Sequence, residues 1–277
     1  MRVWTIPIHR DPRSATRAAQ PAAHVCRAVY LAWGAWLCLL TGCGSSLDGR
    51  NAHVFQQAQQ TFDQARSHED FLRAAAMYQE IIDGGVASGA VWYNQGNAFM
   101  QAGQRGRAIA AYRQAQRYRP RDPYLEANLR FALRNSTLPR RSLMEYVLFW
   151  QNWLSLPEKY WLLGLAAGVA FVLGLIGLLS ERRQLSRLAL ATLVPVLLLV
   201  LSVGYDAYRY RERTHGVVVQ PETVARKGDA VSYEPALTGP LEEGTEFHVV
   251  ERRGDWLLVH LPGGQEGWIE QHAAVLY

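Results

Sequence analysis

The side chains best suited to covalent chemistry in this sequence are its cysteines. Cys43 closes an apolar run and follows two small residues, Thr41 and Gly42, which leave the backbone open to a peptidase. A thiol is the acceptor that attachment of a lipid at such a place requires. Cys26 and Cys38 lie before or inside the same run, so no cysteine pair remains in the later chain for a disulfide or a CxxC site.

The segment before Cys43 has the three-part pattern of a secretory signal. Arginines precede an uncharged run from Ala28 to Leu40, and small residues follow it. The run of about 13 residues is shorter than the roughly 20 that a helix needs to cross a bilayer core. Leu40-Thr41-Gly42-Cys43 resembles the bacterial lipobox, which implies cleavage before Cys43 and its lipidation. The alternative is an uncleaved anchor helix, and both predict export of the segment that follows.

Other arrangements of catalytic residues are missing from the sequence. It has no HExxH motif, no phosphate-binding loop and no activated serine. His248 and His260 could lie on neighbouring strands, but no third ligand stands at a spacing typical of a zinc site. We therefore expect no enzyme activity, no metal and no cofactor.

Charge argues against nucleic acid as a partner. The chain of 277 residues carries a formal net charge of +5. Five arginines and one acid lie in residues 1–42, so the rest of the chain is close to neutral. A nucleic-acid-binding protein keeps its basic surplus in a folded patch. Here the surplus lies in the predicted signal, and we expect no nucleic-acid binding.

The elements that must position the remaining candidate residues begin with a helical repeat. Residues 90–123 resemble a tetratricopeptide repeat, a helix–turn–helix unit of 34 residues. The matching positions are Trp92, Gly96, Phe99, Gly103, Ala108, Tyr112, Ala115 and Pro120. Gln95 departs from the family pattern, which has leucine there. We expect the small residues of this set to let the helices approach closely, and the aromatic ones to fill the space between neighbouring hairpins.

A shift of 34 residues finds an earlier copy of the repeat, in which Ala74 and Tyr78 align with two of these positions. Residues 123–135 then read as a further amphipathic helix that covers the open end. Hairpins of this kind cannot bury their apolar faces alone, and about three are usually needed. The predicted array over residues 55–135 is therefore of minimal size.

Arrays of this family carry no chemistry and present a concave groove to peptides or helices. The resemblance implies that Tyr93, Asn97 and Met100 line this groove and that Asn97 can hydrogen-bond the backbone of a ligand. The alternative is that all three are ordinary solvated helix residues.

Two apolar segments are long enough to cross a membrane. The first, predicted over residues 161–180, follows a capping box that ends in Glu158 and spans about 28 Å as a helix. The second, predicted over 188–205, contains Pro195, which membrane helices tolerate. The turn 181–187 is rich in arginine, which favours the cytoplasm, but arginines also follow the second span. The exported N-terminal segment decides the orientation and places the C-terminus on the exported side.

The C-terminal residues 215–277 alternate short strand patterns with glycine-rich turns, which is typical of a small barrel. The motifs that resemble bacterial SH3-like domains are Glu243-Gly244-Thr245, Gly254-Asp255-Trp256 and residues 264–269. Period-two alternation places Leu257, Val259 and Leu261 in the interior and Trp256 on the opposite face. Trp256 then resembles the tryptophan that packs ligands in SH3 domains, or it simply covers the core. Glu270 stands where polyproline binders have a proline, which argues against polyproline recognition and leaves another peptide as the alternative ligand.

The order of these elements resembles the BatE-type proteins of the bacterial Bat aerotolerance operons. We expect a multi-domain membrane protein with an all-α tetratricopeptide-repeat array, a transmembrane helical hairpin and a small all-β SH3-like barrel. The predicted divisions are a signal peptide (1–42), a linker (43–54), repeats with a capping helix (55–135), an interfacial linker (136–160), two spans (161–180 and 188–205) around a cytoplasmic turn (181–187), and the barrel (215–277).

The resemblance implies a non-catalytic scaffold at the periplasmic face of the bacterial inner membrane. Its implied partners are membrane-anchored von Willebrand A-domain proteins and a MoxR-type ATPase on the cytoplasmic side, together with membrane lipid. The competing hypothesis is a cell-envelope sensor whose SH3-like barrel binds peptidoglycan peptides.

Overall fold

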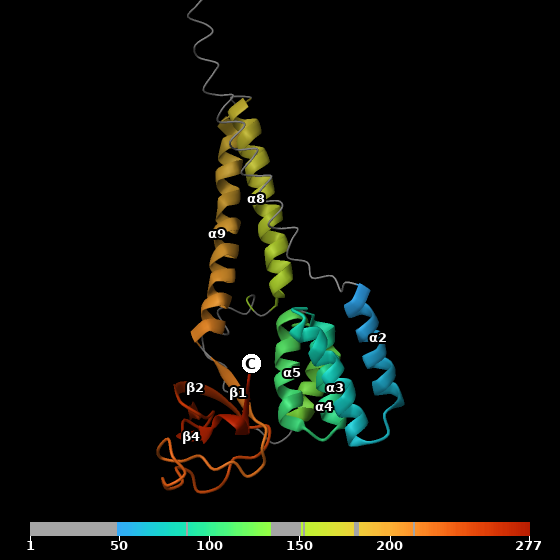
Figure 1. Cartoon of the computed structure of the whole chain (residues 1–277). Coiled ribbons are helices and arrows are strands. Elements are labelled where there is room, and N and C mark those ends of the chain that lie inside the picture. The colour runs from blue at the N-terminus through green and yellow to red at the C-terminus, as the bar shows by residue number, and fades with distance from the viewer. Residues whose placement is uncertain (1–48, 87, 134–150, 152, 180–182, 213) are drawn as a thin grey trace, which may run out of the picture. The chain divides into compact units, whose positions relative to one another are not determined.

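The computed structural model describes residues 49–86, 88–133, 151, 153–179, 183–212 and 214–277 (Figure 1). These residues are mostly helical, with seven α-helices, two of them long and apolar, and a small antiparallel sheet at the C-terminal end. The coarse prediction of helices, two apolar segments and then a small β-structure is confirmed. The predicted signal segment and Cys43 lie outside the described residues.

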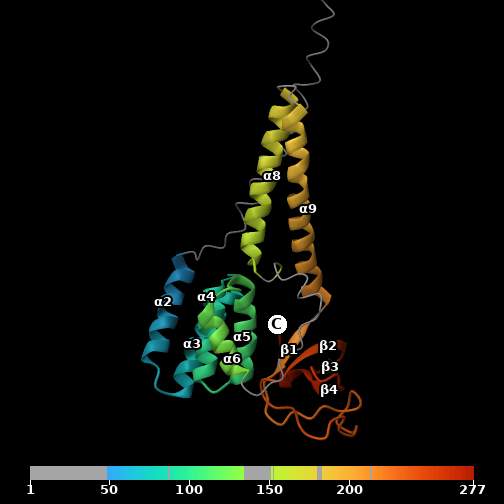
Figure 2. The ribbon, with the colours of Figure 1, turned by 180° about the vertical axis from the view of Figure 1, so that it is seen from behind.

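Five helices form the first part of the described chain, which we call the helical region (Figures 1 and 2). They are α2 (Gly49–Gln64), α3 (His68–Asp83), α4 (Gly89–Gln101), α5 (Arg105–Tyr118) and α6 (Pro123–Ala132). Each helix packs against the next one. α2 begins inside the expected linker 43–54, because Val54 and Phe55 pack against Tyr78 and its neighbours and stabilise the turn before them.

Local signals explain where these helices begin and end. The Ser67 hydroxyl accepts a bond from the Asp70 amide (3.2 Å), and the Asp70 carboxylate accepts one from the Ser67 amide (3.0 Å), which completes a capping box for α3. The Asp122 carboxylate caps α6 by accepting a bond from the Tyr124 amide (2.9 Å). Gly103 has φ +75°, a conformation that glycine adopts without strain, and it turns the chain between α4 and α5.

Small and aromatic side chains fill the helical region. Ala74, Ala75 and Ala98 form one fully buried cluster between α3 and α4. Gly96 faces the ring of Tyr112, and a Cβ at position 96 would lie 2.5 Å from that ring. The ring therefore occupies the space that a larger residue at 96 would need.

The two long apolar helices are α8 (Leu156–Leu179) and α9 (Arg183–Glu212), and they pack against each other as an antiparallel hairpin. The segments Leu156–Gly177 and Arg187–Tyr208 are each long and apolar enough to cross a membrane. α8 starts earlier than the predicted span because Glu158 accepts a bond from the Ser155 amide (2.8 Å) and caps the helix there. α9 begins inside the predicted turn. It also runs past the predicted end at 205, because residues 206–212 include no glycine or proline to favour an end of the helix.

The C-terminal residues form a five-stranded sheet, which we call the sheet domain. Its strands are β1 (His215–Val218), β2 (Glu246–Arg253), β3 (Trp256–His260), β4 (Glu266–Glu270) and β5 (Ala274–Leu276), in the order β4-β3-β2-β1-β5. All neighbouring strands are antiparallel. The predicted interior residues Leu257, Val259 and Leu261 are buried, which confirms the period-two interpretation of β3. Ala225 and Leu241, from the long connection between β1 and β2, cover the same core.

Candidate functional site

Two of the predicted groove residues, Tyr93 and Asn97, lie on the side of α4 that meets α6. The Asn97 side-chain oxygen accepts bonds from the Tyr112 hydroxyl (2.9 Å) and the Asn128 amide (2.9 Å). Asn128 also donates to the Tyr93 hydroxyl (3.1 Å). Met100 is partly buried against the same core. Tyr93 and Asn97 therefore help to hold α6 in place, and all three predicted groove residues keep part of their surface exposed.

Gln95, at which the resemblance predicts leucine, is fully buried between two helices. Its side-chain amide donates to the Gln79 side-chain oxygen (2.8 Å) and to the Ala75 carbonyl (3.3 Å) of α3. A buried amide is tolerated when it has hydrogen-bond partners. α4 is thus tied to α3 by a polar contact at a place where the repeat pattern predicts an apolar one.

The sheet domain docks on α5 and supplies a cap that this helix lacks. Gln104, at the N-cap position, makes no side-chain capping bond. The Glu243 carboxylate, from the loop before β2, instead accepts a bond from the Gly106 amide (2.7 Å), and Arg105 donates to the Glu243 carbonyl. Gly106 approaches β1 so closely that a Cβ would collide with the Val218 carbonyl oxygen. This close docking therefore requires glycine at position 106.

A largely buried ion pair joins another part of the same junction. Arg113 of α5 makes two bonds to the Glu246 carboxylate of β2, from Nε (2.7 Å) and from Nη2 (2.8 Å). The Tyr277 hydroxyl donates to the same carboxylate. Burial by itself would raise the pKa of Glu246, but the bonds and the charge of Arg113 outweigh burial, so the pKa lies below its usual value. Val217 and Val275 add apolar contacts to the α5 side.

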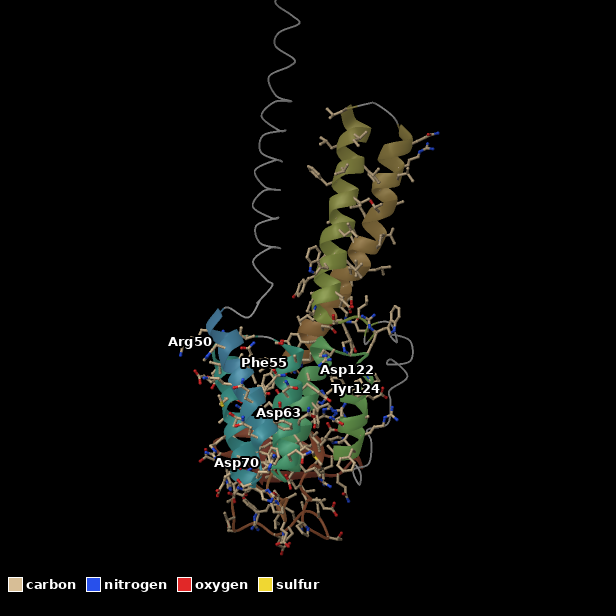
Figure 3. The ribbon with its side chains drawn as sticks, turned by 90° about the vertical axis from the view of Figure 1, so that its right-hand side faces the viewer. Arg50, Phe55, Asp63, Asp70, Asp122 and Tyr124 are labelled. Atoms are coloured by element: carbon tan, nitrogen blue, oxygen red, sulfur yellow. The ribbon has the colours of Figure 1, made fainter. Side chains whose placement is uncertain are left out.

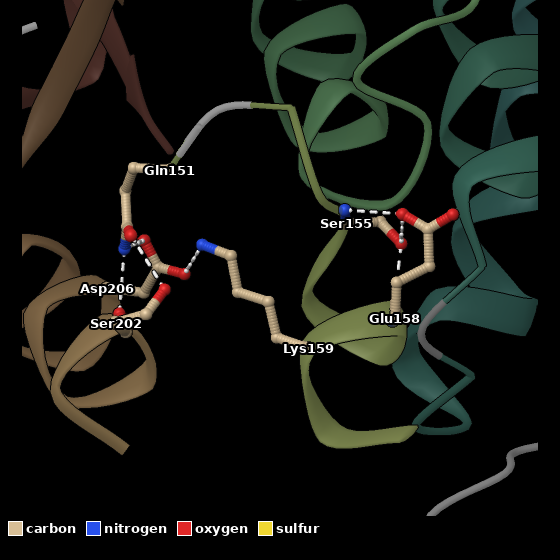
Figure 4. Close-up of polar contacts among 6 residues, drawn as sticks. All are labelled: Gln151, Ser155, Glu158, Lys159, Ser202 and Asp206. Carbon is tan, nitrogen blue, oxygen red and sulfur yellow. Dashed lines mark hydrogen bonds and ion pairs between the residues drawn. The ribbon is translucent and has the colours of Figure 1, made fainter. Parts of the chain in front are cut away.

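A polar cluster joins the beginning of α8 to the later part of α9 (Figure 4). Lys159 Nζ lies 2.6 Å from Asp206 Oδ2, and the Lys159 side chain is only 1% exposed. Gln151 donates to Asp206 Oδ1 (2.9 Å) and to the Ser202 carbonyl (2.7 Å), and the Ser202 hydroxyl donates back to Gln151 (2.6 Å). A buried charge is tolerated when it is paired and hydrogen-bonded. The cluster meets that condition and fixes the two helix ends to each other.

Trp256, the predicted ligand-packing residue, lies partly exposed on the outer face of the sheet. Its register partners are Arg253 on β2 and Glu270 on β4. The more buried tryptophan of this part of the sheet is Trp268, whose ring lies 4.8 Å from the Arg253 guanidinium. Trp256 thus lies between two charged cross-strand neighbours and keeps part of its surface exposed.

His248 and His260 are register partners on β2 and β3, and His215 on β1 extends the row. The ring centroids of His215 and His248 lie 4.2 Å apart, while His260 contacts Glu266 at 3.1 Å. The three histidines follow one another across the strands rather than converging on a point. In the part of the chain that the structure describes, no group of three side chains could hold a metal ion.

Sequence patterns did not indicate Lys159, Asp206, Arg113 or Glu246 as site residues. Lys159 and Asp206 lie just outside the predicted spans, and opposite charges at matching ends of two spans are a signal that could have found them. Arg113 and Glu246 are far apart in the sequence and belong to different predicted modules, so no spacing rule connects them.

Comparisons with known proteins give no relatives, since no family model, no curated protein and no solved structure matches the chain.

Proposed function

We propose that the protein is a non-catalytic, membrane-tethered scaffold. In this proposal the helical region is a short tetratricopeptide array, the sheet domain is SH3-like, and α8 and α9 cross the bacterial inner membrane. Both folded modules then lie in the periplasm and bind protein partners in a Bat-type complex. The partners implied by the resemblance are von Willebrand A-domain proteins and a MoxR-type ATPase.

The observation that carries this proposal is the docking of the sheet domain on α5. A scaffold needs its binding surfaces in a fixed relation to one another. Glu243, Gly106 and the Arg113–Glu246 pair join a module before the apolar hairpin to one after it. Among the described residues, these junction contacts do not use the side chains of Met100 or Trp256, and both keep part of their surface exposed for a partner.

The exposure of apolar side chains on α8 and α9 supports the membrane part of the proposal. Trp161, Leu165 and Leu190 are 81%, 66% and 67% exposed. Contiguous exposed apolar surface of this kind is rare on soluble monomers and is what a bilayer covers. The charges of Lys159 and Asp206 are paired between the two helices, which spares the surrounding lipid an isolated charge.

Topology is tested by thiol labelling of intact cells. Cysteine is introduced at Val231, which is 64% exposed on the sheet domain, or at Ser186 near the start of α9. We expect an impermeant maleimide to label V231C in whole cells and S186C only after lysis. The parent chain, with its native cysteines, gives the background. Labelling of S186C with protection of V231C would contradict the periplasmic placement.

Partner capture is tested with a photo-reactive residue at Met100, which lies on the predicted groove and has no side-chain hydrogen bond to lose. The control carries the same residue at Glu80, whose side chain on α3 is 59% exposed. Irradiation of intact membranes should cross-link von Willebrand A-domain proteins to position 100 and not to position 80. Equal capture at both positions would remove the groove from the proposal.

The partial exposure of Trp256 favours a second candidate function, a cell-envelope sensor that binds peptidoglycan peptides. Retention of the full chain on purified murein separates the two. Strong retention that Trp256→Ala abolishes supports the sensor, whereas no retention together with cross-linking at position 100 supports the scaffold.

A further inference from the structure

An open depression of about 390 Å³ lies between the α5–α6 turn and the start of α8. It is lined by residues 118–124 on one side and by Ser155 and Glu158 on the other. Its volume falls within the range of about 300–1,000 Å³ that is usual for small-molecule sites. The depression adjoins the predicted groove residue Tyr93, because the Arg119 guanidinium on its wall lies 5.5 Å from the centre of that ring, and its lining residues include none of those at the junction with the sheet domain.

The walls of this depression carry two positive and two negative groups. Arg121 pairs with Glu158, and Arg119 pairs with Asp122 at 2.5 Å. The Arg121 and Glu158 side chains line the depression and are 45% and 39% exposed. A guanidinium has five N–H donors, and the bond to Glu158 uses one of the Arg121 group. Because the charges balance, the walls suit a ligand with one charge of each sign better than a simple anion.

The position of the depression points to a lipid. Glu158 lies in the first turn of α8, where the apolar segment Leu156–Gly177 begins. Trp153 and Trp161 nearby are 61% and 81% exposed, and the Arg121 guanidinium lies 5.3 Å from the centre of the Trp153 ring. Exposed tryptophans are typical of the level at which lipid headgroups lie. Tyr124, labelled with Asp122 in Figure 3, lines the same depression as Glu158.

We infer that this depression binds the headgroup of a zwitterionic phospholipid, with its phosphate on Arg121 and its ammonium on Glu158. The inference rests on the proposed membrane span of α8. Tyr124, which is 75% exposed, offers a further hydroxyl donor to the phosphate. The acyl chains then follow the apolar surface of α8, and the bound lipid holds the α5–α6 turn against the membrane surface.

The test uses the full chain extracted in detergent and native mass spectrometry with added phosphatidylethanolamine or phosphatidylglycerol. Wild type should retain one phosphatidylethanolamine in preference to phosphatidylglycerol, and inorganic phosphate should not displace it. Arg121→Gln should lower retention at least about tenfold, as expected for loss of a charge-assisted hydrogen bond. Tyr124→Phe, at an exposed position where misfolding is not expected, should lower it by a smaller factor.

Arg130→Gln is the matched control, because Arg130 forms an exposed ion pair with Glu126 on α6 outside the depression. Equal retention by R121Q and R130Q, equal binding of both lipids, or displacement by phosphate overturns the inference. Membrane fractionation separates this failure from that of the proposed function. If the wild-type chain does not sediment with membranes, both the proposed function and the headgroup site are refuted. If R121Q is membrane-bound and keeps its lipid, only the headgroup site is refuted.

Discussion

At the scale of single residues, two glycines on neighbouring helices make room for different partners. Gly96 of α4 accommodates the ring of Tyr112, and Gly106 of α5 accommodates the backbone at Val218 of the sheet domain. Intrinsic helix propensity alone favours alanine over glycine at such positions by about 1 kcal/mol. Glycine nevertheless suits positions 96 and 106, because neither position has room for a Cβ.

Gly106→Ala should open the junction between α5 and the sheet domain. The added Cβ collides with a backbone oxygen, which cannot rotate away as a side chain can, and overpacking of this kind costs about 1–3 kcal/mol. We expect faster hydrogen exchange in β1 and at the amide of residue 106, measured by mass spectrometry on the full chain. Gly49→Ala is the control, since nothing lies within 4 Å of a Cβ there. Unchanged exchange in β1 would show that the docking does not depend on this contact.

Gly96→Ala should instead weaken the α4–α5 pair. The Tyr112 ring must move, and it carries with it the bond from its hydroxyl to Asn97. We expect a loss of about 1–3 kcal/mol in the stability of the helical region, seen as a lower midpoint in chemical denaturation. The exchange of β1 should change less than it does in Gly106→Ala, and the reverse order would contradict the assignment of the two glycines.

The ionisation of Glu246 makes the junction sensitive to acid. The pKa of Glu246 is lowered in the folded chain. Its contribution to the stability of the junction is therefore fully present above the pKa of the unfolded chain and is lost as the pH falls through the pKa of the folded chain. Acidification from neutral pH to below about 4 should therefore loosen the junction. Glu246→Gln should weaken the junction at neutral pH by about 1.5–3 kcal/mol and make its stability depend less on pH. The measurement is the rate of amide hydrogen exchange in β1 as a function of pH.

Glu126→Gln provides the comparison, because its ion pair with Arg130 is exposed and exposed pairs contribute at most about 1 kcal/mol. It should leave the exchange of β1 unchanged at every pH. An acid dependence that survives in Glu246→Gln would assign the effect to another group.

At the scale of elements, the polar cluster between α8 and α9 depends on complementary charge. Asp206→Ala leaves Lys159 buried without its partner and should lower stability in detergent by about 3–5 kcal/mol, measured as the midpoint of thermal aggregation. The double exchange Lys159→Asp with Asp206→Lys should restore part of that loss. The same exchange in the exposed pair Lys227–Glu234 should have little effect. A double exchange no better than the single variant would argue against a specific pair.

The elements themselves followed from local signals in the sequence, whereas the contacts between distant elements did not. A capping box and a proline within an apolar run both act over a few residues, so the roles of Glu158 and Pro195 can be predicted from their neighbouring sequence alone. The bond from Gly106 to Glu243 joins residues 137 positions apart, and neither side chain is unusual in its own neighbourhood. The groove role of Asn97 stays a prediction from its position in the repeat pattern, and that pattern did not indicate the bond that its side-chain oxygen accepts from Asn128 of α6.

At the scale of the whole described chain, ion pairs connect the helical region with the apolar hairpin and with the sheet domain. Glu158 of α8 pairs with Arg121 of the helical region, and Lys159 one residue later pairs with Asp206 of α9. The sheet domain then returns to α5 through Glu246 and Arg113. The helical region is therefore linked by ion pairs both to the apolar hairpin and to the sheet domain.

The passage from α9 to the sheet has a consequence for which insertions the chain can accept. α9 ends at Glu212 and β1 begins at His215, so very little slack separates a long helix from a strand. Each residue added to an α-helix advances it by about 1.5 Å and rotates whatever follows by roughly 100°. A single inserted amino acid in α9 would swing β1 away from α5, while the same insertion in the long connection between β1 and β2 would be absorbed. Homologues of this chain should therefore vary in length in that connection and hardly at all in α9.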